Sequence, residues 1–163
     1  MLGGLLPGCG YRFATGEARL DEGGRRLAIP LAEHRTTEAW PAAHFTRALR
    51  REAARAGLQL VPADRTGPGC PALWSRVLAA EAVPRAVAVR GGRYRTREQE
   101  VRVVVEMALR GPDEAVPPWR LDERVSYLSA PDLRGTEANR QLAVRRALAR
   151  LARRAVDRLV GRF

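Results

Sequence analysis

Two neighbouring stretches near the middle of the chain alternate between apolar and polar residues. In residues 101–110 apolar side chains recur at every second position, and residues 119–127 repeat this period. A period of two places successive side chains on opposite faces of a strand. The pattern therefore predicts an antiparallel pair with one buried and one solvated face, joined through residues 111–114. The apolar positions are Val101, Val103, Val105, Met107, Leu109, Trp119, Leu121, Val125 and Tyr127.

Two further strands are predicted from shorter or less regular patterns. Residues 27–31 alternate apolar and small side chains, and Pro30 indicates an edge strand or the end of a strand. Residues 74–89 are predicted to form a long strand with a bend or bulge at Pro84, because proline has no N–H for the ladder. A glycine-containing turn at residues 91–95 separates this strand from the next.

Two helices are predicted from apolar residues that recur at helical spacing. The first begins between Thr37 and Pro41 and ends before Gly57, and residues 62–71 form a loop. The second runs from Thr136, its expected N-cap, to Leu159. The order β-α-β-β-β-α predicts an α+β two-layer sandwich, with two helices packed on one face of a four-stranded, mostly antiparallel sheet.

Composition sets the size of the domain and raises a question about its charge. The 163 residues are 45% hydrophobic, enough for a single domain with a buried core, and no run of 18 apolar residues occurs. All 29 basic residues are arginine, and the net charge is +11. This charge favours an anionic partner, whereas the abundance of Arg, Ala, Gly and Pro is also typical of a GC-rich genome.

The N-terminus contains a candidate lipidation site. Residues 6–9 read Leu-Pro-Gly-Cys, which fits the lipobox of bacterial lipoproteins, except that a small residue is usual at Pro7. We expect residues 1–8 to be the remnant of a signal peptide, Cys9 to carry lipid, residues 9–24 to form a tether and residues 25–163 to form the domain. Cys70 is then a buried or incidental thiol; without acylation, a Cys9–Cys70 disulfide becomes possible.

Motifs of catalysis and cofactor binding do not occur in the sequence. His34 and His44 are the only histidines, and their spacing fits no zinc motif. The chain also has no nucleophile elbow, P-loop or dinucleotide fingerprint. We therefore predict a protein that is not an enzyme, with no metal and no cofactor apart from the covalent lipid on Cys9.

The start of the predicted mature chain and its order of elements resemble a known family. Cys9-Gly10-Tyr11-Arg12-Phe13, the Arg90-Gly91-Gly92 turn and Thr136-Glu137-Ala138-Asn139 before a long last helix are similar to the lipopolysaccharide-assembly lipoprotein family LptE. The resemblance implies a non-enzymatic outer-membrane lipoprotein on the periplasmic face, with palmitate among its expected lipids. In that family the domain sits as a plug inside the LptD β-barrel, helps the barrel to assemble and contacts lipopolysaccharide.

The resemblance also suggests which residues contact lipopolysaccharide. Arg90 occupies the turn where the family has a basic residue linked to this contact, and Arg93 and Arg95 follow closely. Arg134 is the nearest counterpart of a second basic position near the last helix. Arginine suits this ligand because its planar guanidinium binds phosphate by two hydrogen bonds. A solvated hairpin tip is the alternative explanation of the cluster.

Two other classes of protein share some of these features. A basic nucleic-acid-binding module would account for the charge, but the predicted strands do not carry the row of aromatic residues on which bases stack. Another periplasmic lipoprotein of similar fold, such as a secretin pilot protein, would account for the lipobox and the element order. The preferred interpretation has a β-barrel, lipopolysaccharide and the inner leaflet of the outer membrane as partners, and no nucleic acid.

Overall fold

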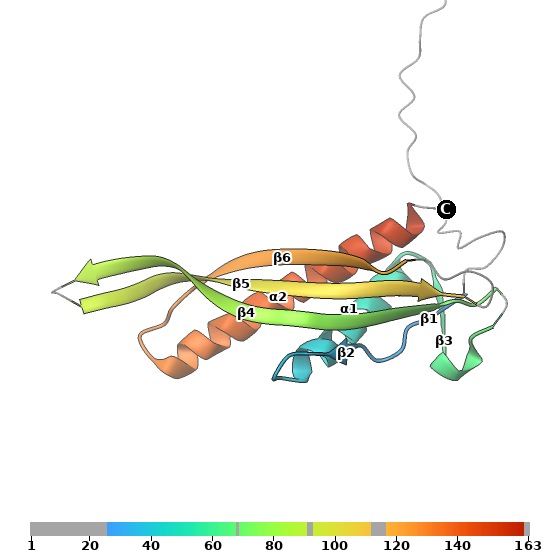
Figure 1. Ribbon diagram of the computed structural model, residues 1–163, viewed down its shortest axis with the longest axis horizontal. Coiled ribbons are helices and arrows are strands. Elements are labelled where there is room, and N and C mark those ends of the chain that lie inside the picture. Colours follow the sequence, from blue (N-terminus) through green and yellow to red (C-terminus); the bar gives the residue numbers. More distant parts are fainter. Residues whose placement is uncertain (1–25, 68, 91–92, 112–116, 162–163) are drawn as a thin grey trace, which may run out of the picture.

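The computed structural model describes residues 26–67, 69–90, 93–111 and 117–161, without the side chains of residues 84–97. Within these residues the chain forms three short strands, three long strands and two α-helices (Figure 1). A single turn of 3-10 helix at Ala63–Arg65 precedes the long strands. The elements are β1 (Arg26–Ala28), β2 (Glu33–His34), α1 (Trp40–Arg55), β3 (Gln59–Val61), β4 (Ala72–Arg90), β5 (Arg93–Arg110), β6 (Trp119–Leu128) and α2 (Leu133–Val160).

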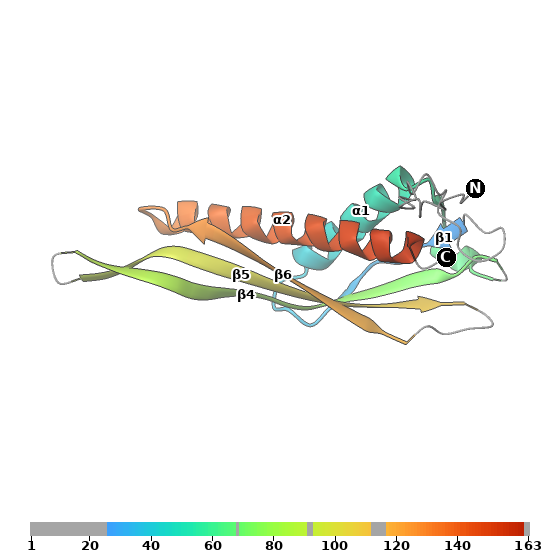
Figure 2. The same ribbon diagram turned by 90° about the horizontal axis from the view of Figure 1, so that it is seen from above.

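The two helices cover one face of the sheet and leave the other face open to solvent (Figure 2). α2 lies along β5 and β6, and α1 packs beside α2. The predicted apolar faces of β5 and β6 point toward the helices, and both Val103 and Leu148 are fully buried. The predicted α+β class with two helices on one face of the sheet is thus confirmed.

The sheet is larger than the predicted one, and it is mixed. In the described residues it has six strands in the order β3-β1-β4-β5-β6, and β2 pairs with β4 beside this path. β1 runs parallel to both β3 and β4, whereas β4, β5 and β6 are antiparallel. The prediction of four mostly antiparallel strands is therefore only roughly right. It missed β2 and β3 because segments of two and three residues are too short to show a period.

β4 and β5 form a hairpin that is much longer than its neighbours. They contain 19 and 18 residues, and β6 pairs with β5 only as far as Glu98. The register shifts between Pro84 and Ala86, which confirms the irregularity predicted at the proline. β5 begins at Arg93 instead of residue 101, because the strand continues beyond the segment whose one face is apolar.

The residues at the helix ends can be compared with the predicted caps. Gly57 directly follows the C-cap of α1 and has φ +79°, so the predicted helix end is confirmed. α2 begins three residues before the predicted start, because Asp132 is its N-cap and accepts a hydrogen bond of 2.6 Å from the Gly135 N–H. The Thr136 hydroxyl accepts a hydrogen bond of 3.0 Å from the Ala130 N–H instead, so it fixes the turn before the helix.

Candidate functional site

The outer half of the β4–β5 hairpin projects beyond the helices (Figure 1). It contains three of the four predicted lipopolysaccharide-contact residues, Arg90, Arg93 and Arg95. The backbone pairs Arg90 with Arg93 across the end of the hairpin, and Arg95 with Ala88. This pairing brings the three arginines close together in the ladder, and it places Arg93 and Arg95 in β5 instead of in the predicted turn. Their side chains lie outside the part that the structure describes.

A polar network fixes the base of the hairpin to β6. The Tyr127 hydroxyl donates to the Gln99 side-chain oxygen, and Gln99 Nε2 donates to Ser129 Oγ at 3.1 Å. Tyr127 is buried, and this burial raises the pKa of its hydroxyl. The network therefore holds β5 to the end of β6 at the point where the hairpin leaves the body of the domain.

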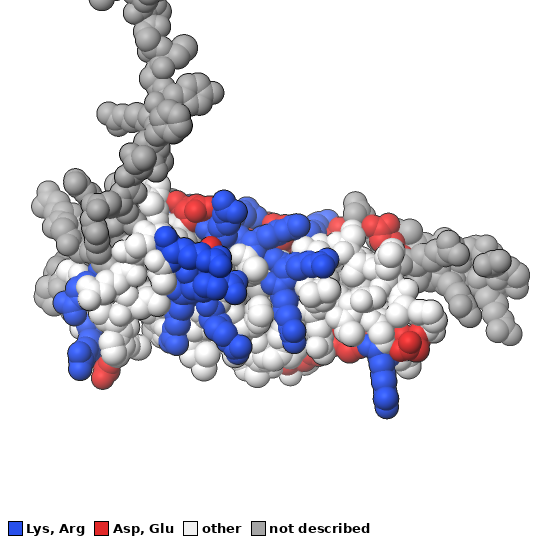
Figure 3. Space-filling model, turned by 180° about the vertical axis from the view of Figure 1, so that it is seen from behind, with Lys and Arg blue, Asp and Glu red and all other residues white. Residues whose placement is uncertain are grey.

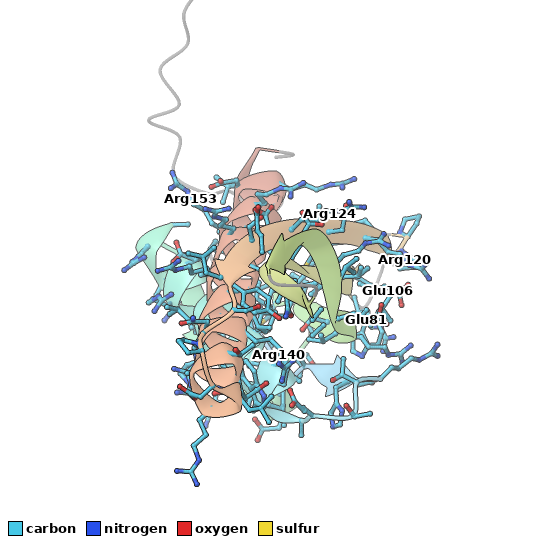
Figure 4. The ribbon with its side chains drawn as sticks, turned by 90° about the vertical axis from the view of Figure 1, so that its left-hand side faces the viewer. Glu81, Glu106, Arg120, Arg124, Arg140 and Arg153 are labelled. Carbon is cyan, nitrogen blue, oxygen red and sulfur yellow. The ribbon has the colours of Figure 1, made fainter. Side chains whose placement is uncertain are left out.

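The first turns of α2 are fixed by an ion-pair network around Arg140 (Figure 4). Its guanidinium lies 2.7 Å from Glu38 Oε1, in the segment before α1, and 2.8 Å from Glu137 Oε2 in α2. The hydrogen bond from Arg140 lowers the pKa of Glu137. Asn139 Nδ2 also donates to the Leu128 carbonyl at 2.9 Å, so α2 is attached both to the segment before α1 and to β6.

Arg134 lies in the first turn of α2 and is exposed to solvent. Figures 1 and 2 show that this end of α2 and the tip of the β4–β5 hairpin lie toward the same end of the molecule. The fold thus places all four predicted contact residues toward one end, Arg90, Arg93 and Arg95 by backbone position and Arg134 by the position of its helix turn.

The solvent-facing side of the sheet carries charges of both signs that pair with one another. Glu33 Oε2 lies 2.6 Å from Arg76, and the hydrogen bond from Arg76 lowers the pKa of Glu33. Arg120 lies 2.9 Å from Glu106, whose other oxygen is 3.9 Å from Arg76. The row crosses β2, β4, β5 and β6, and Figure 4 shows Glu106 and Arg120 on this side. The sequence did not reveal it, because β2 was not predicted to lie beside β4.

Trp74 lies on the same solvent-facing side, among these charges. The guanidinium carbons of Arg76 and Arg110 are 4.6 Å and 4.7 Å from the centroid of its ring. Trp74 Nε1 donates to Glu33 Oε1 at 3.0 Å. Trp119, by contrast, is buried under the helices. The described sheet face therefore presents one tryptophan with arginine against its ring, and it does not present a row of aromatic residues.

The helix side has a very different charge balance. α1 and α2 contain twelve arginines and three acidic residues, whereas the described side chains of β4, β5 and β6 include five arginines and six acidic residues. Figure 3 shows the helix side, where arginines cover much of the surface. Burial, followed by the charges of Arg145, Arg47 and Arg51, lowers the pKa of His44 on α1. Sequence analysis found the net charge but not its segregation to one side.

The structure also bears on the two cysteines, on metal binding and on membrane-spanning helices. Cys70 is buried and is a free thiol, and Cys9 lies outside the described residues. The part of the chain that the structure describes has no group of three or more potential metal-binding side chains. Nor do the described helices include one that is long and apolar enough to cross a membrane.

Several solved structures share the fold of this chain. A protein from Caulobacter crescentus that is described as a lipoprotein is 22% identical, with a TM-score of 0.56, and the match covers 84% of this chain and 89% of that one. A minor lipoprotein from Acinetobacter baumannii is 18% identical, with a TM-score of 0.55 and coverage of 85% and 92%. Rare lipoprotein B from Shewanella oneidensis is 18% identical, with a TM-score of 0.51 and coverage of 84% and 92%. At these identities the likeness establishes the fold alone.

Sequence comparison gives the family. No curated protein sequence matches the chain. The family model described as "LptE: Lipopolysaccharide-assembly" matches residues 25–160, which include both helices and the whole sheet. The chain therefore belongs to the LptE family of lipopolysaccharide-assembly lipoproteins.

Proposed function

We propose that this lipopolysaccharide-assembly lipoprotein is anchored through Cys9 to the periplasmic face of the outer membrane and is a partner of an LptD-like β-barrel. In this proposal it fills the barrel as a non-enzymatic plug and contacts lipopolysaccharide with the tip of the β4–β5 hairpin. The observation that carries the proposal is the family match over residues 25–160. The projecting hairpin supplies the surface for the contact.

The chemistry of the hairpin supports contact with lipopolysaccharide. Lipid A carries phosphates, and guanidinium groups bind phosphate through paired, charge-assisted hydrogen bonds. The backbone ladder places Arg90 opposite Arg93, with Arg95 two residues further along β5. A ligand with several phosphates can engage several arginines at such a tip, with Arg134 as an additional contact from α2.

The surface of the domain supports a position inside a barrel. The lumen of a large outer-membrane barrel is polar, so a plug needs polar faces on more than one side. The sheet side carries the Glu33–Arg76–Glu106–Arg120 row, and the helix side carries exposed arginines. The apolar core lies between these two polar surfaces.

The lipopolysaccharide contact is tested by removing charge from the hairpin tip. We expect Arg90→Gln/Arg93→Gln to weaken binding of purified lipopolysaccharide by about tenfold or more, because each lost charge-assisted contact is worth about 1.5–3 kcal/mol. The matched control, Arg102→Gln/Arg120→Gln, removes two exposed charges from the body of the sheet and should bind as the unmodified chain does. Equal binding by the tip variant and the unmodified chain would refute the contact.

The anchor is tested by replacing its thiol. We expect Cys9→Ser to remove the site of acylation and to release a folded domain from the outer-membrane fraction, because the acyl chains hold the protein at the bilayer. Membrane fractionation and the intact mass of the native protein give the result. Unchanged fractionation together with an unmodified Cys9 in the native protein would contradict the proposed anchor.

A further inference from the structure

The strand β4 has an open stretch of backbone along one of its edges. Its other edge pairs with β5 along the length of the hairpin. The open edge pairs with β1 at Ala72 and with β2 at Arg76 and Val77, and no strand of the described residues pairs with it from Ala79 onward. The chain leaves this edge after Arg35, whose N–H donates to the Val77 carbonyl at 2.9 Å, and turns into α1 (Figure 1). An unpaired edge of this kind can accept a further strand.

The position of Pro84 shows which backbone groups face the open edge. Proline has no N–H, so within a strand it takes a position that points away from the ladder partner. The register between β4 and β5 has no shift within residues 79–84. Because the residues of an antiparallel strand face its two edges alternately, Ala80 and Ala82 face outward with Pro84. The N–H and C=O groups of both alanines therefore point to the open edge, whereas those of Glu81 belong to the ladder with β5.

The open segment is short, and its side chains are small. Irregular backbone at either end limits it to residues 79–83. Ala82 and Val83 are exposed, and Ala80 is partly buried against the core. Proteins commonly protect such an edge with basic side chains, whereas the one charged residue of this segment is Glu81. Within these five positions, no bulky or basic side chain keeps a strand away from the edge.

The two sides of the sheet beside this edge indicate which side chains a pairing strand would carry. Ala80 lies opposite Val103, which is fully buried under the helices, so an apolar residue next to Ala80 would extend the core. Glu81 lies on the solvent-facing side of the sheet (Figure 4). It forms no ion pair with another described side chain, because its ladder partner Arg102 lies 4.0 Å from Asp122 instead. The edge therefore suits a strand with apolar residues toward the helices and a basic residue beside Glu81.

We propose that an extended segment of the β-barrel partner pairs with the open edge of β4 as an additional strand and bonds to the backbone of Ala80 and Ala82. This pairing rests on the proposed function, because inside a lumen the barrel is the chain within reach of the edge. The strands of a closed barrel pair with one another and have no free edge, so the segment is a loop that enters the lumen. Main-chain hydrogen bonds hold such a strand, and its alternating side chains give specificity.

Two other strands suit this edge less well. The described chain begins at Arg26 in β1, which meets β4 at Ala72, near the other end of that strand. A second copy of the chain, paired about a two-fold axis centred on the open segment, would place Glu81 opposite the same residue of its partner. Two carboxylates would then meet where the edge calls for a basic residue, and like charges opposite each other destabilise the pairing.

Amide hydrogen exchange tests the pairing in the full chain, both alone and in the complex with the barrel from outer membranes. We expect the Ala80 and Ala82 amides to exchange rapidly in the chain produced without the barrel and at least about tenfold more slowly in the complex. The Glu81 amide belongs to the ladder with β5 and should be protected in both. The Asp122 carbonyl accepts from Arg154 and so faces away from β5, as the Arg124 amide also does. This amide on the opposite edge of the sheet is the control and should exchange alike in both samples.

A proline at the open edge gives an independent measurement. Ala82→Pro removes one outward N–H and keeps the β4–β5 ladder, as Pro84 does two residues further on. We expect the variant to dissociate from the barrel in detergent at least about fivefold faster, because a backbone carbonyl of the partner loses its donor. The matched control, Ala82→Ser, keeps the N–H and should dissociate as the unmodified chain does. Circular dichroism checks that each variant is folded.

Several outcomes would overturn the pairing at the β4 edge. If the barrel is present but the Ala80 and Ala82 amides exchange as in the free chain, or if the two Ala82 variants dissociate alike, the pairing is wrong and the proposed function stands. Equal slowing at Arg124 would show general exclusion of water in place of strand pairing. Protection in the free chain would assign the edge to a second copy if it rises with concentration, and to another part of the same chain if it does not. Absence of any barrel from the purified chain would refute the proposed function and the pairing together.

Discussion

Individual arginines in this domain have three distinct environments. Arg140 joins α2 to the segment before α1 through two carboxylates, and Arg50 donates to the Ile29 carbonyl at 2.7 Å. Arg76 and Arg110 lie against the Trp74 ring. Arg145 is exposed, and no ion pair joins it to a carboxylate of the described residues. In the first two environments the arginine side chain is bound to other groups of the domain. In the third, its charge is available to a partner.

His44 gives a prediction at the residue scale. Burial and three nearby arginines lower its pKa in the folded protein, whereas the unfolded chain protonates near the ordinary value of about 6.5. As the pH falls through that value the unfolded state takes up more protons, so the free energy of unfolding decreases. We expect this decrease between pH 7.5 and 5.5 in urea titrations, and we expect His44→Gln to diminish it.

The control for His44 is the second histidine. His34 is exposed and its ring contacts the Thr36 carbonyl, so His34→Gln is a matched substitution away from the environment of His44. If His44→Gln retained the whole of that change, the account of the His44 environment would be wrong.

The ends of helices could be predicted where a capping residue coincided with the end of an apolar stripe. Gly57 follows the last residues of an apolar helical stripe, and its positive φ bears out the predicted C-terminal signal. The N-cap of α2 was misassigned because the first turn of this helix has no apolar stripe: Leu133 is 88% exposed. No buried face marks the start of the helix, and the prediction named Thr136 alone; the structure has Asp132 as the N-cap, while the Thr136 hydroxyl bonds the turn before the helix.

At the scale of elements, a strand could be predicted where one of its faces packs on the core, because the buried face gives the sequence a period of two. Val101, Val103 and Val105 are fully buried, and their period of two identified this part of β5 correctly. β5 continues back to Arg93 in a two-stranded hairpin, and there no helix imposes that period. β2 and β3 are held by pairing with distant segments, and such pairing leaves no local trace in two or three residues.

The hairpin itself gives an element-scale prediction. Replacing residues 87–97 by Asn-Gly joins Ala86 to its ladder partner Glu98 through a two-residue turn. β6 and α2 contact the body of the sheet, so we expect the thermal midpoint to stay within about 3 °C of the unmodified value. We also expect lipopolysaccharide binding to be lost, because the replaced segment contains Arg90, Arg93 and Arg95.

A core substitution supplies the contrast for this experiment. Leu148 on α2 is fully buried, and Leu148→Ala should lower the stability by about 2–5 kcal/mol and reduce the thermal midpoint clearly. A shortened hairpin that destabilised the domain as much as Leu148→Ala would show that the tip belongs to the folding unit. Retention of full lipopolysaccharide affinity by the shortened chain would exclude the tip as the contact.

For the whole molecule, the sequence predicted the layers but not the distribution of charge over them. Two amphipathic helices and strands with one polar face sufficed to predict the sandwich. The net charge of +11 is a property of composition, whereas its concentration on the helix side depends on both helices packing against the same face. On the opposite face, β2 brings Glu33 beside Arg76 and adds one more ion pair to the row. That pairing depends on topology, which local patterns do not encode.

The measurement that tests the proposed function most directly is purification of the native, full-length chain from detergent-solubilised outer membranes, with mass spectrometry of what accompanies it. The account predicts a large outer-membrane β-barrel in stoichiometric amount, together with lipopolysaccharide. The untreated inner-membrane fraction serves as the control and should yield neither. Recovery of the chain alone, or with nucleic acid in place of a barrel, would contradict the account.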